Sequence, residues 1–145
     1  MKAITILEPW ASLIACGAKK IETRSWPTKY RGPIAIHAGK ALPSNDRQII
    51  ADTLYEKQQF HLPLGKVIAI ADLIDCVKVI GFDEFANSPI LDRKEWLLQD
   101  AKESAFGDYT IGRYAWILDN VRRIDLIPAK GMQRIWNWES ADNGR

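Results

Sequence analysis

The feature that most constrains the fold of this chain is the apolar run VIAIADLIDCVKVI at residues 67–80. It is the longest apolar segment and is rich in β-branched residues, a composition typical of a central β-strand. Asp72 and Asp75 interrupt the run, and we expect the strand to bend near one of them. The same two acids could instead indicate a metal site, but two carboxylates without further ligands give that interpretation little support.

Shorter segments alternate between apolar and polar residues with the period of a strand. These segments are residues 2–7, 20–24, 33–38 and 114–121, with 122–128 expected to continue in extended form. Helices are predicted between the strands, over 10–16 before Gly17, over 44–59, over 91–102 with Asp92 as its N-cap, and after a turn within 130–138. Strand and helix do not alternate regularly, so we predict an α+β fold with a curled, mainly antiparallel sheet or small barrel.

Composition places the chain among ordinary globular proteins. Its 145 residues suit one domain, and a content of 47% hydrophobic and 26% charged residues argues against disorder. We expect a single domain over 1–138 and a frayed tail over 139–145. No apolar run approaches the roughly 18–20 residues needed to cross a bilayer. The N-terminal segment lacks a signal peptide's apolar core and cleavage site, so a cytoplasmic location without membrane contact is expected.

The net charge of +2 supports only weak, salt-sensitive attraction to polyanions, so any case for nucleic-acid binding depends on how the charges cluster. Cys16 and Cys76 lie far apart and match no metal-ligand spacing, and we expect neither a metal nor another cofactor.

Residues 8–40 are unusually dense in groups that could act on a ligand. Gly17, Lys19, Glu22 and Arg24 form the pattern G-x-K-x-x-E-x-R, in which glycine ends a helix and a strand follows. Glu22 and Arg24 share one face of that strand and could pair with each other or bind a phosphate. Strict alternation places Lys19 on the opposite face, so the three converge only if Lys19 still belongs to the turn or the strand is bulged.

A plainer interpretation is that these charges form a solvated ion-pair network of little energetic value. Neighbouring aromatic and basic residues weaken that interpretation, because single strands and flipped bases are held by aromatic faces beside positive charges. These residues are Trp10, Trp26 and Tyr30 with Lys20, Lys29 and Arg31.

Several blocks of the sequence together resemble the ASCH domain family, which belongs to the PUA-like superfamily. The blocks are EPWASLI, GAKKIETRSW, YRGPIAIHA, ADLIDC and KGMQRIW, and they span residues 4 to about 138. The resemblance is closest to the branch whose eukaryotic members form the C-terminal domain of the activating signal cointegrator. G-x-K-x-x-E-x-R alone would be a weak match, but the flanking blocks make it specific.

The resemblance implies a PUA-like, partly open β-barrel with flanking short helices, and a cleft beside the first helix that is used for RNA, DNA or nucleotides. Transferred to this sequence, the residues expected to bind nucleic acid are Trp10, Ser12, Lys19, Lys20, Glu22, Arg24, Trp26, Arg31 and Lys130. Lys130 and Arg134 would extend a basic cleft if the C-terminal turn folds back on the first helix. His37 closes an apolar strand and is expected to be structural, although its place near Lys40 leaves a role at the rim open.

Two departures from the family pattern bear on function. Glu8 stands where members of this branch usually carry Gln, and in the cleft it would repel a phosphate or have a raised pKa. Glu22 stands where some family enzymes, which resemble acylcytidine amidohydrolases, carry Thr. Thr23 is expected on the other side of the strand, so a Thr nucleophile is missing from the expected place.

The preferred hypothesis is a binding module in which Lys19 and Arg24 contact phosphates, Trp10 or Trp26 stacks on a base, and Glu22 orients Arg24 or accepts from a base amino group. The alternative is an enzyme on nucleic acid or a modified nucleoside, either a metal-independent ribonuclease or an acylcytidine amidohydrolase. In that case Lys19 would stabilise charge or transfer a proton, and Glu22 would be the general base. The two differ in Lys19, since a catalytic base needs a buried lysine of depressed pKa and a phosphate contact needs an exposed one. A role in protein interaction alone is the third possibility, with no partner indicated.

Overall fold

The computed structural model describes residues 1–41, 44–45, 62–93, 96–98 and 100–139. The helix predicted over 44–59 and the tail predicted over 139–145 therefore fall almost entirely outside the described residues.

The described chain is built on one mixed sheet with the strand order β2-β7-β4-β3-β1-β8. These strands are β1 (Lys2–Ile6), β2 (Ile21–Arg24), β3 (Gly32–Ala38), β4 (Lys66–Asp83), β7 (Tyr114–Pro128) and β8 (Ile135–Asn137). β1 and β3 run parallel, and the other neighbours pair antiparallel. In the part of the chain that is described, β2 and β8 at the two ends do not pair, so the sheet is not closed into a barrel. The predicted small α+β fold with a mainly antiparallel sheet is confirmed.

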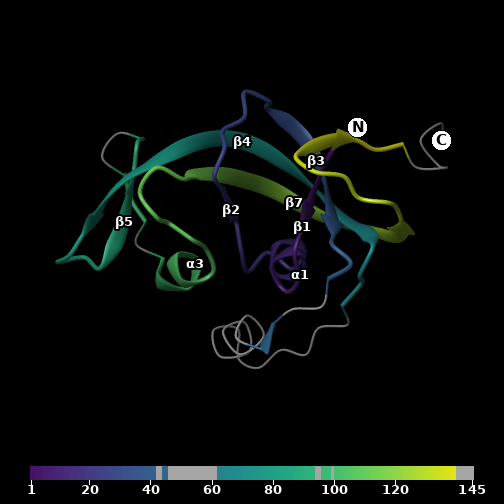
Figure 1. Cartoon of the computed structure of the whole chain (residues 1–145), viewed down its shortest axis with the longest axis horizontal. Helices are drawn as coiled ribbons and strands as arrows, with labels where there is room; N and C mark the ends of the chain where they lie inside the picture. The colour runs from purple at the N-terminus through teal and green to yellow at the C-terminus, as the bar shows by residue number, and fades with distance from the viewer. Residues whose placement is uncertain (42–43, 46–61, 94–95, 99, 140–145) are drawn as a thin grey trace.

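The two longest strands, β4 and β7, arch across the whole molecule and pair along most of their length (Figure 1). β4 contains the whole apolar run at 67–80, as predicted. Its register against β7 shifts between Ile70 and Asp72 and again between Leu73 and Asp75. Bulges of this kind bend a strand and increase its twist, which accounts for the predicted bend beside the two acids. Asp72 pairs with Arg122 at 3.4 Å, and Asp75 pairs with Arg31 at 3.5 Å.

The helix predicted over 91–102 is wrong. The chain instead forms a hairpin of β5 (Ser88–Leu91) and β6 (Trp96–Leu97), and then a short helix α3 (Ala101–Ala105). Leu91 is fully buried and pairs with Val79 of β4, so it is not available to begin a helix. The N-cap is Asp100, whose carboxylate accepts the Glu103 N–H at 3.1 Å. Asp100 and Glu103 are three residues apart, which is the same spacing as Asp92 and Glu95, on which the wrong N-cap prediction was based.

The short helix predicted within 130–138 is also wrong, because Ile135–Asn137 forms β8 against β1. Trp136 lies opposite Ala3 in this pairing and is buried with it. Three strand residues at the C-terminus cannot be told from a helical turn by periodicity alone, and burial of Trp136 on the sheet decides the conformation.

Helix α1 (Trp10–Ala15) and α3 lie on the same side of the arched sheet (Figure 1). The interior of α1 is buried against β3, β4 and β7, and Ile14 joins the main core together with Trp116 and Ile36. No helix in the described ranges is long and apolar enough to span a membrane. The loops that leave α1 and α3 meet at β2, and the candidate site lies there.

Candidate functional site

The turn after α1 places Lys19 beside the strand that carries Glu22. Gly17 has φ +87°, a left-handed conformation that favours glycine, and its N–H donates to Ile14 O at 3.0 Å. The Ala18 N–H donates to Leu13 O at 3.0 Å, which completes a Schellman motif at the end of the helix. β2 begins only at Ile21, so Lys19 still belongs to the turn. The condition for convergence of Lys19, Glu22 and Arg24 is therefore met.

Glu22 and Arg24 form a tight ion pair on β2. Arg24 donates from Nη2 and from Nε to Glu22 Oε2, at 2.9 and 3.1 Å. The same Nη2 donates to the Thr5 carbonyl of β1 at 2.7 Å. The side chains of Glu22 and Arg24 are 12% and 23% exposed, so the pair is largely shielded from solvent. The pair therefore differs from a solvated surface network of ion pairs, because it is largely shielded and links β2 to β1 through the bond from Arg24 to Thr5.

Lys19 is buried, with a relative exposure of 1%. Its ammonium donates to the Ile21 carbonyl and lies 4.0 Å from Glu22 Oε1. Burial lowers the pKa of Lys19, the carboxylates of Glu22 and Glu103 oppose that effect, and Arg24 adds to it. A direct contact between Lys19 and a phosphate remains a prediction, and in this structure the ammonium is buried against the Ile21 carbonyl.

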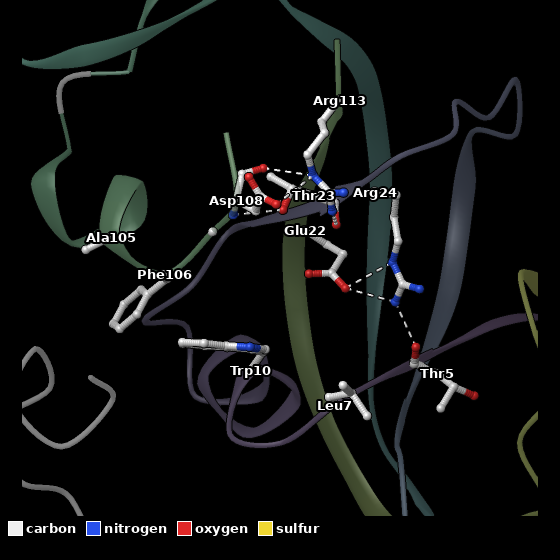
Figure 2. A pocket seen from close by; sticks show the side chains of 11 residues that line it. Thr5, Leu7, Trp10, Glu22, Thr23, Arg24, Ala105, Phe106, Asp108 and Arg113 are labelled. Carbon is white, nitrogen blue, oxygen red and sulfur yellow. Dashed lines mark hydrogen bonds and ion pairs between the residues drawn. The ribbon is translucent and has the colours of Figure 1, made fainter. Parts of the chain in front are cut away.

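An open cleft of about 460 Å³ lies between α1, β2 and the loop after α3 (Figure 2). Figure 2 shows the Trp10 ring edge-on beneath the Glu22 carboxylate, with Phe106 beside it and Arg24 on the opposite side. The Trp10 and Phe106 rings are 6.0 Å apart at an interplanar angle of 59° and form one apolar wall. The cleft is lined by Thr5, Leu7, Trp10, Glu22, Thr23, Arg24, Ala105, Phe106, Gly107, Asp108 and Arg113.

The charged side chains of this cleft balance one another. Its lining carries two carboxylates, Glu22 and Asp108, and two guanidinium groups, Arg24 and Arg113. The sequence predicted a basic cleft, whereas the described lining residues carry equal numbers of acidic and basic side chains. A cleft of this kind favours a ligand that offers hydrogen-bond donors and an aromatic face as well as negative charge.

The loop after α3 supplies cleft residues that the sequence analysis did not identify. The Thr23 hydroxyl accepts the Asp108 N–H at 3.2 Å, and Arg113 donates to the Thr23 carbonyl at 3.2 Å. Thr23 thereby holds this loop against β2. No local signal in the sequence placed Phe106 or Arg113 opposite Glu22, more than 80 residues away.

Buried titratable groups lie behind the cleft. Glu103 is 4% exposed, and one of its oxygens accepts the Lys20 N–H. Burial raises the pKa of Glu103, and Lys19 acts in the opposite direction. Burial also raises the pKa of the Tyr109 phenol. Among the residues that the structure describes, Glu103 Oε2 and the Tyr109 hydroxyl are buried without a hydrogen-bond partner. This is an uncommon arrangement for two polar atoms in one place.

Glu8, the first departure from the family pattern, does not face the cleft. Its side chain is fully buried, and its carboxylate accepts the Ser12 N–H at 2.7 Å and the Ser12 hydroxyl at 2.5 Å. Because the N-cap position is Pro9, which makes no side-chain cap, Glu8 satisfies a backbone donor of the first turn instead. Burial raises the pKa of Glu8, and the two bonds from Ser12 act in the opposite direction. Ser12 is thus occupied inside the helix and does not line the cleft.

The remaining predicted site residues lie apart from the cleft. The Trp26 and Trp116 rings pack at right angles with their centroids 4.8 Å apart, and the Arg134 guanidinium lies over the Trp26 ring, 4.3 Å from its centroid. Arg31 is exposed and pairs with Asp75, and Lys20 is exposed. Lys130 lines a separate hollow together with His37 and Lys40. The C-terminal turn therefore folds back on β1, β3 and Trp26. Of the nine predicted binding residues, the structure brings Trp10, Glu22 and Arg24 together in the cleft.

In the described residues, an open, mainly antiparallel sheet with the short helices α1 and α3 on one side is a small α+β fold consistent with the PUA-like type. The ASCH domain family matches residues 4–128, most of the chain, and the chain belongs to that family. It is similar to Activating signal cointegrator 1 of Mus musculus, with 33% identity over 145 aligned residues that cover 94% of this chain and 22% of the mouse protein. It is also 33% identical to Activating signal cointegrator 1 of Homo sapiens over 88 residues, 56% of this chain and 15% of the human protein. The chain therefore spans about a fifth of the length of the mouse relative.

Proposed function

We propose that this ASCH domain binds single-stranded nucleic acid, RNA or DNA, by taking one nucleobase into the cleft between Trp10 and Glu22. The observation that carries the proposal is the exposed part of the Trp10 ring beneath a polar pair in an open cleft of about 460 Å³ (Figure 2). Stacking on an aromatic side chain is the common means by which proteins hold an unpaired base. Membership of the ASCH family is consistent with this use of the cleft.

The polar groups above Trp10 suit the edge of a base. Glu22 Oε2 already accepts two hydrogen bonds from Arg24, whereas Oε1 lies 4.0 Å from Lys19 Nζ, beyond hydrogen-bond distance. In Figure 2 this second oxygen points away from Arg24. It can accept a hydrogen bond from an exocyclic amino group, as carboxylates do with cytosine N4. Arg24 then has a double role, since it orients Glu22 and offers its remaining edge to the sugar–phosphate backbone.

A fluorescence-anisotropy titration tests the proposal, with labelled single-stranded RNA and duplex DNA at several salt concentrations. The native chain is expected to bind the single strand more tightly than the duplex. Trp10→Leu keeps an apolar contact with Phe106 but removes the stacking face. Because stacking contributes roughly 1–3 kcal/mol per base, Kd should rise by about 5- to 150-fold.

Trp26→Leu is the matched control, since Trp26 is also half-buried at the edge of the main core but lies outside the cleft. Both variants are first compared by thermal unfolding, so that a loss of binding is not confused with a loss of fold. Equal binding by the native chain and folded Trp10→Leu would contradict the proposal.

The burial of Lys19 favours a second candidate, an enzyme on nucleic acid or an acylated cytidine. A lysine with a lowered pKa 4.0 Å from a carboxylate meets the condition set by the sequence analysis for a catalytic lysine. Glu22, which lines the cleft, would act as general base, and Lys19, 4.0 Å from it, would transfer a proton or stabilise charge. The oligonucleotides from the titration are checked for cleavage on a denaturing gel, and an N4-acylated cytidine is incubated and analysed by chromatography. Lys19→Met should abolish any turnover while the protein stays folded, and turnover retained in this variant would remove Lys19 from the mechanism.

A further inference from the structure

A second hollow of about 360 Å³ lies on the other side of Thr5 from the cleft. Lys40 and Lys130, both exposed, are part of its lining, and His37 and Gly131 lie beside them. Thr5 lines both cavities, so the hollow and the cleft adjoin each other across a single residue of β1.

The fold brings the two lysines together through Gly65, although they are 90 residues apart. The Gly65 N–H donates to Ala38 O at 2.8 Å, at the end of the strand that leads to Lys40. The Gly65 carbonyl accepts the Ala129 N–H at 3.0 Å, directly before Lys130. A Cβ at Gly65 would lie 3.3 Å from Cγ and Cε of Lys40, so the aliphatic stem of Lys40 rests on the bare backbone of this glycine. The backbone at Gly65 therefore brings the chain segments that carry the two lysines together, and it supports the stem of Lys40.

A chain of hydrogen bonds fixes the wall of the hollow. The Trp136 indole donates to the Thr5 hydroxyl at 3.1 Å, and the hydroxyl lies 3.1 Å from His37 Nδ1. Nε2 of His37 lies 2.9 Å from the Ala129 carbonyl, to which it must donate because a carbonyl only accepts. Nδ1 has the Thr5 hydroxyl as its partner, so both ring nitrogens are engaged and the ring has no polar atom left for a ligand. His37 is thus structural, and the lysines are the groups in the hollow that are available to bind.

Charge distinguishes this hollow from the cleft. Its described lining residues include two lysines and no carboxylate, whereas the cleft carries two carboxylates against two guanidinium groups. Arg24 and Arg113 are each paired with a carboxylate, so the cleft offers little net positive charge to the phosphates of a bound strand. Lysine ammonium groups bind phosphate as compact point charges, and two exposed lysines line the hollow that adjoins the cleft at Thr5.

We propose that Lys40 and Lys130 form a phosphate subsite for the nucleotide adjoining the one whose base occupies the cleft. This inference rests on the proposed function, and it gives the bound strand a path from Trp10 over Thr5 to the hollow. It assigns a binding role to Lys40, which lies outside the G-x-K-x-x-E-x-R segment.

The test is the salt dependence of binding to labelled single-stranded RNA, measured for the native chain and for Lys40→Gln/Lys130→Gln. Each phosphate contact contributes about 0.7 to the slope of log K against log salt for a single strand. Because the two lysines hold one phosphate, the double variant should lose about 0.7 from the slope and bind more weakly at low salt. Both side chains are exposed, so the variant is expected to fold normally.

Lys78→Gln/Lys102→Gln removes the same net charge from two exposed lysines away from the hollow and is the control. Its slope should match that of the native chain. If the native chain binds and the two double variants have equal slopes, the phosphate subsite is refuted while the cleft remains. If the native chain binds no single strand at any salt concentration, the proposed function itself fails, and this inference with it.

Discussion

The Glu22–Arg24 pair provides a quantitative test of how far the site differs from a surface ion pair. We consider a double-mutant cycle with Glu22→Gln, Arg24→Met and the combined variant. Arg24→Met keeps most of the side-chain length while removing both donors to Glu22 Oε2 and the donor to the Thr5 carbonyl. Glu22→Gln keeps the shape of the acceptor and removes its charge.

The expected magnitude follows from the geometry and the burial of the pair. Exposed ion pairs give coupling energies of about 0.2–1 kcal/mol, and hydrogen bonds to charged groups contribute about 1.5–3 kcal/mol. The side chains of Glu22 and Arg24 are 12% and 23% exposed, and two donors at 2.9 and 3.1 Å meet one oxygen. We therefore expect a coupling energy of about 1.5–3 kcal/mol.

The assay is urea unfolding followed by tryptophan fluorescence, repeated at low salt and in about 1 M NaCl. Salt screens exposed charges strongly and shielded pairs much less, so most of the coupling should persist at high salt. The Asp72–Arg122 pair, 3.4 Å apart with side chains 31% and 43% exposed, is the matched control cycle. It should give at most about 1 kcal/mol. A coupling energy between Glu22 and Arg24 no larger than that of this control would refute the reasoning. The pair would then behave as a solvated surface ion pair of little energetic value.

Two further predictions concern residues around the site. Because burial raises the pKa of Glu8, the folded state holds this proton more tightly than the unfolded state, so its contribution to stability is lost as pH rises through the folded pKa. Glu8→Gln should therefore lose less unfolding free energy than the native chain as the pH rises from the ordinary glutamate pKa of 4.5 towards neutrality in urea titrations, and identical losses would contradict the assignment. At Gly131, a Cβ would lie 2.6 Å from His37 Cε1 and from the Thr5 hydroxyl, so Gly131→Ala should destabilise the fold by roughly 1–3 kcal/mol. Gly39→Ala, whose nearest contact would be an ordinary 3.4 Å, should cost clearly less in the same unfolding experiment, and equal costs would show that the close approach is relieved without strain.

Much of the fold could be predicted because it is encoded locally. The alternation of apolar residues identified β1, β2, β3 and the start of β7, and the apolar run at 67–80 identified β4. A strand's side chains alternate between its faces, so a half-buried strand shows its period in the sequence. Gly17 ended the first helix as predicted, since its φ of +87° favours a residue without a Cβ.

The errors occurred where two local patterns were nearly equivalent. Asp92 and Asp100 are each followed by a glutamate three residues later, and both resemble the start of a helix. Leu91, next to Asp92, pairs with Val79 of β4, so the chain before Asp92 is a strand. Asp100 is therefore the residue that caps a helix, α3. Residues 135–137 were likewise predicted to be helical, but they pair with β1 and form β8.

By itself, the sequence determined the family, the strand-rich fold and the set of charged groups on residues 19–24, because each follows from neighbouring residues or from a recognisable pattern. Only the tertiary structure decided what those groups can do. It buried Lys19 and Glu103, brought Arg113 into the cleft from about 90 residues further along the chain, and placed Lys40 and Lys130 in the lining of one hollow. Burial, pKa and net charge in a cavity depend on every chain segment that surrounds it. They are therefore set by contacts between distant residues, which local patterns in a single sequence do not encode.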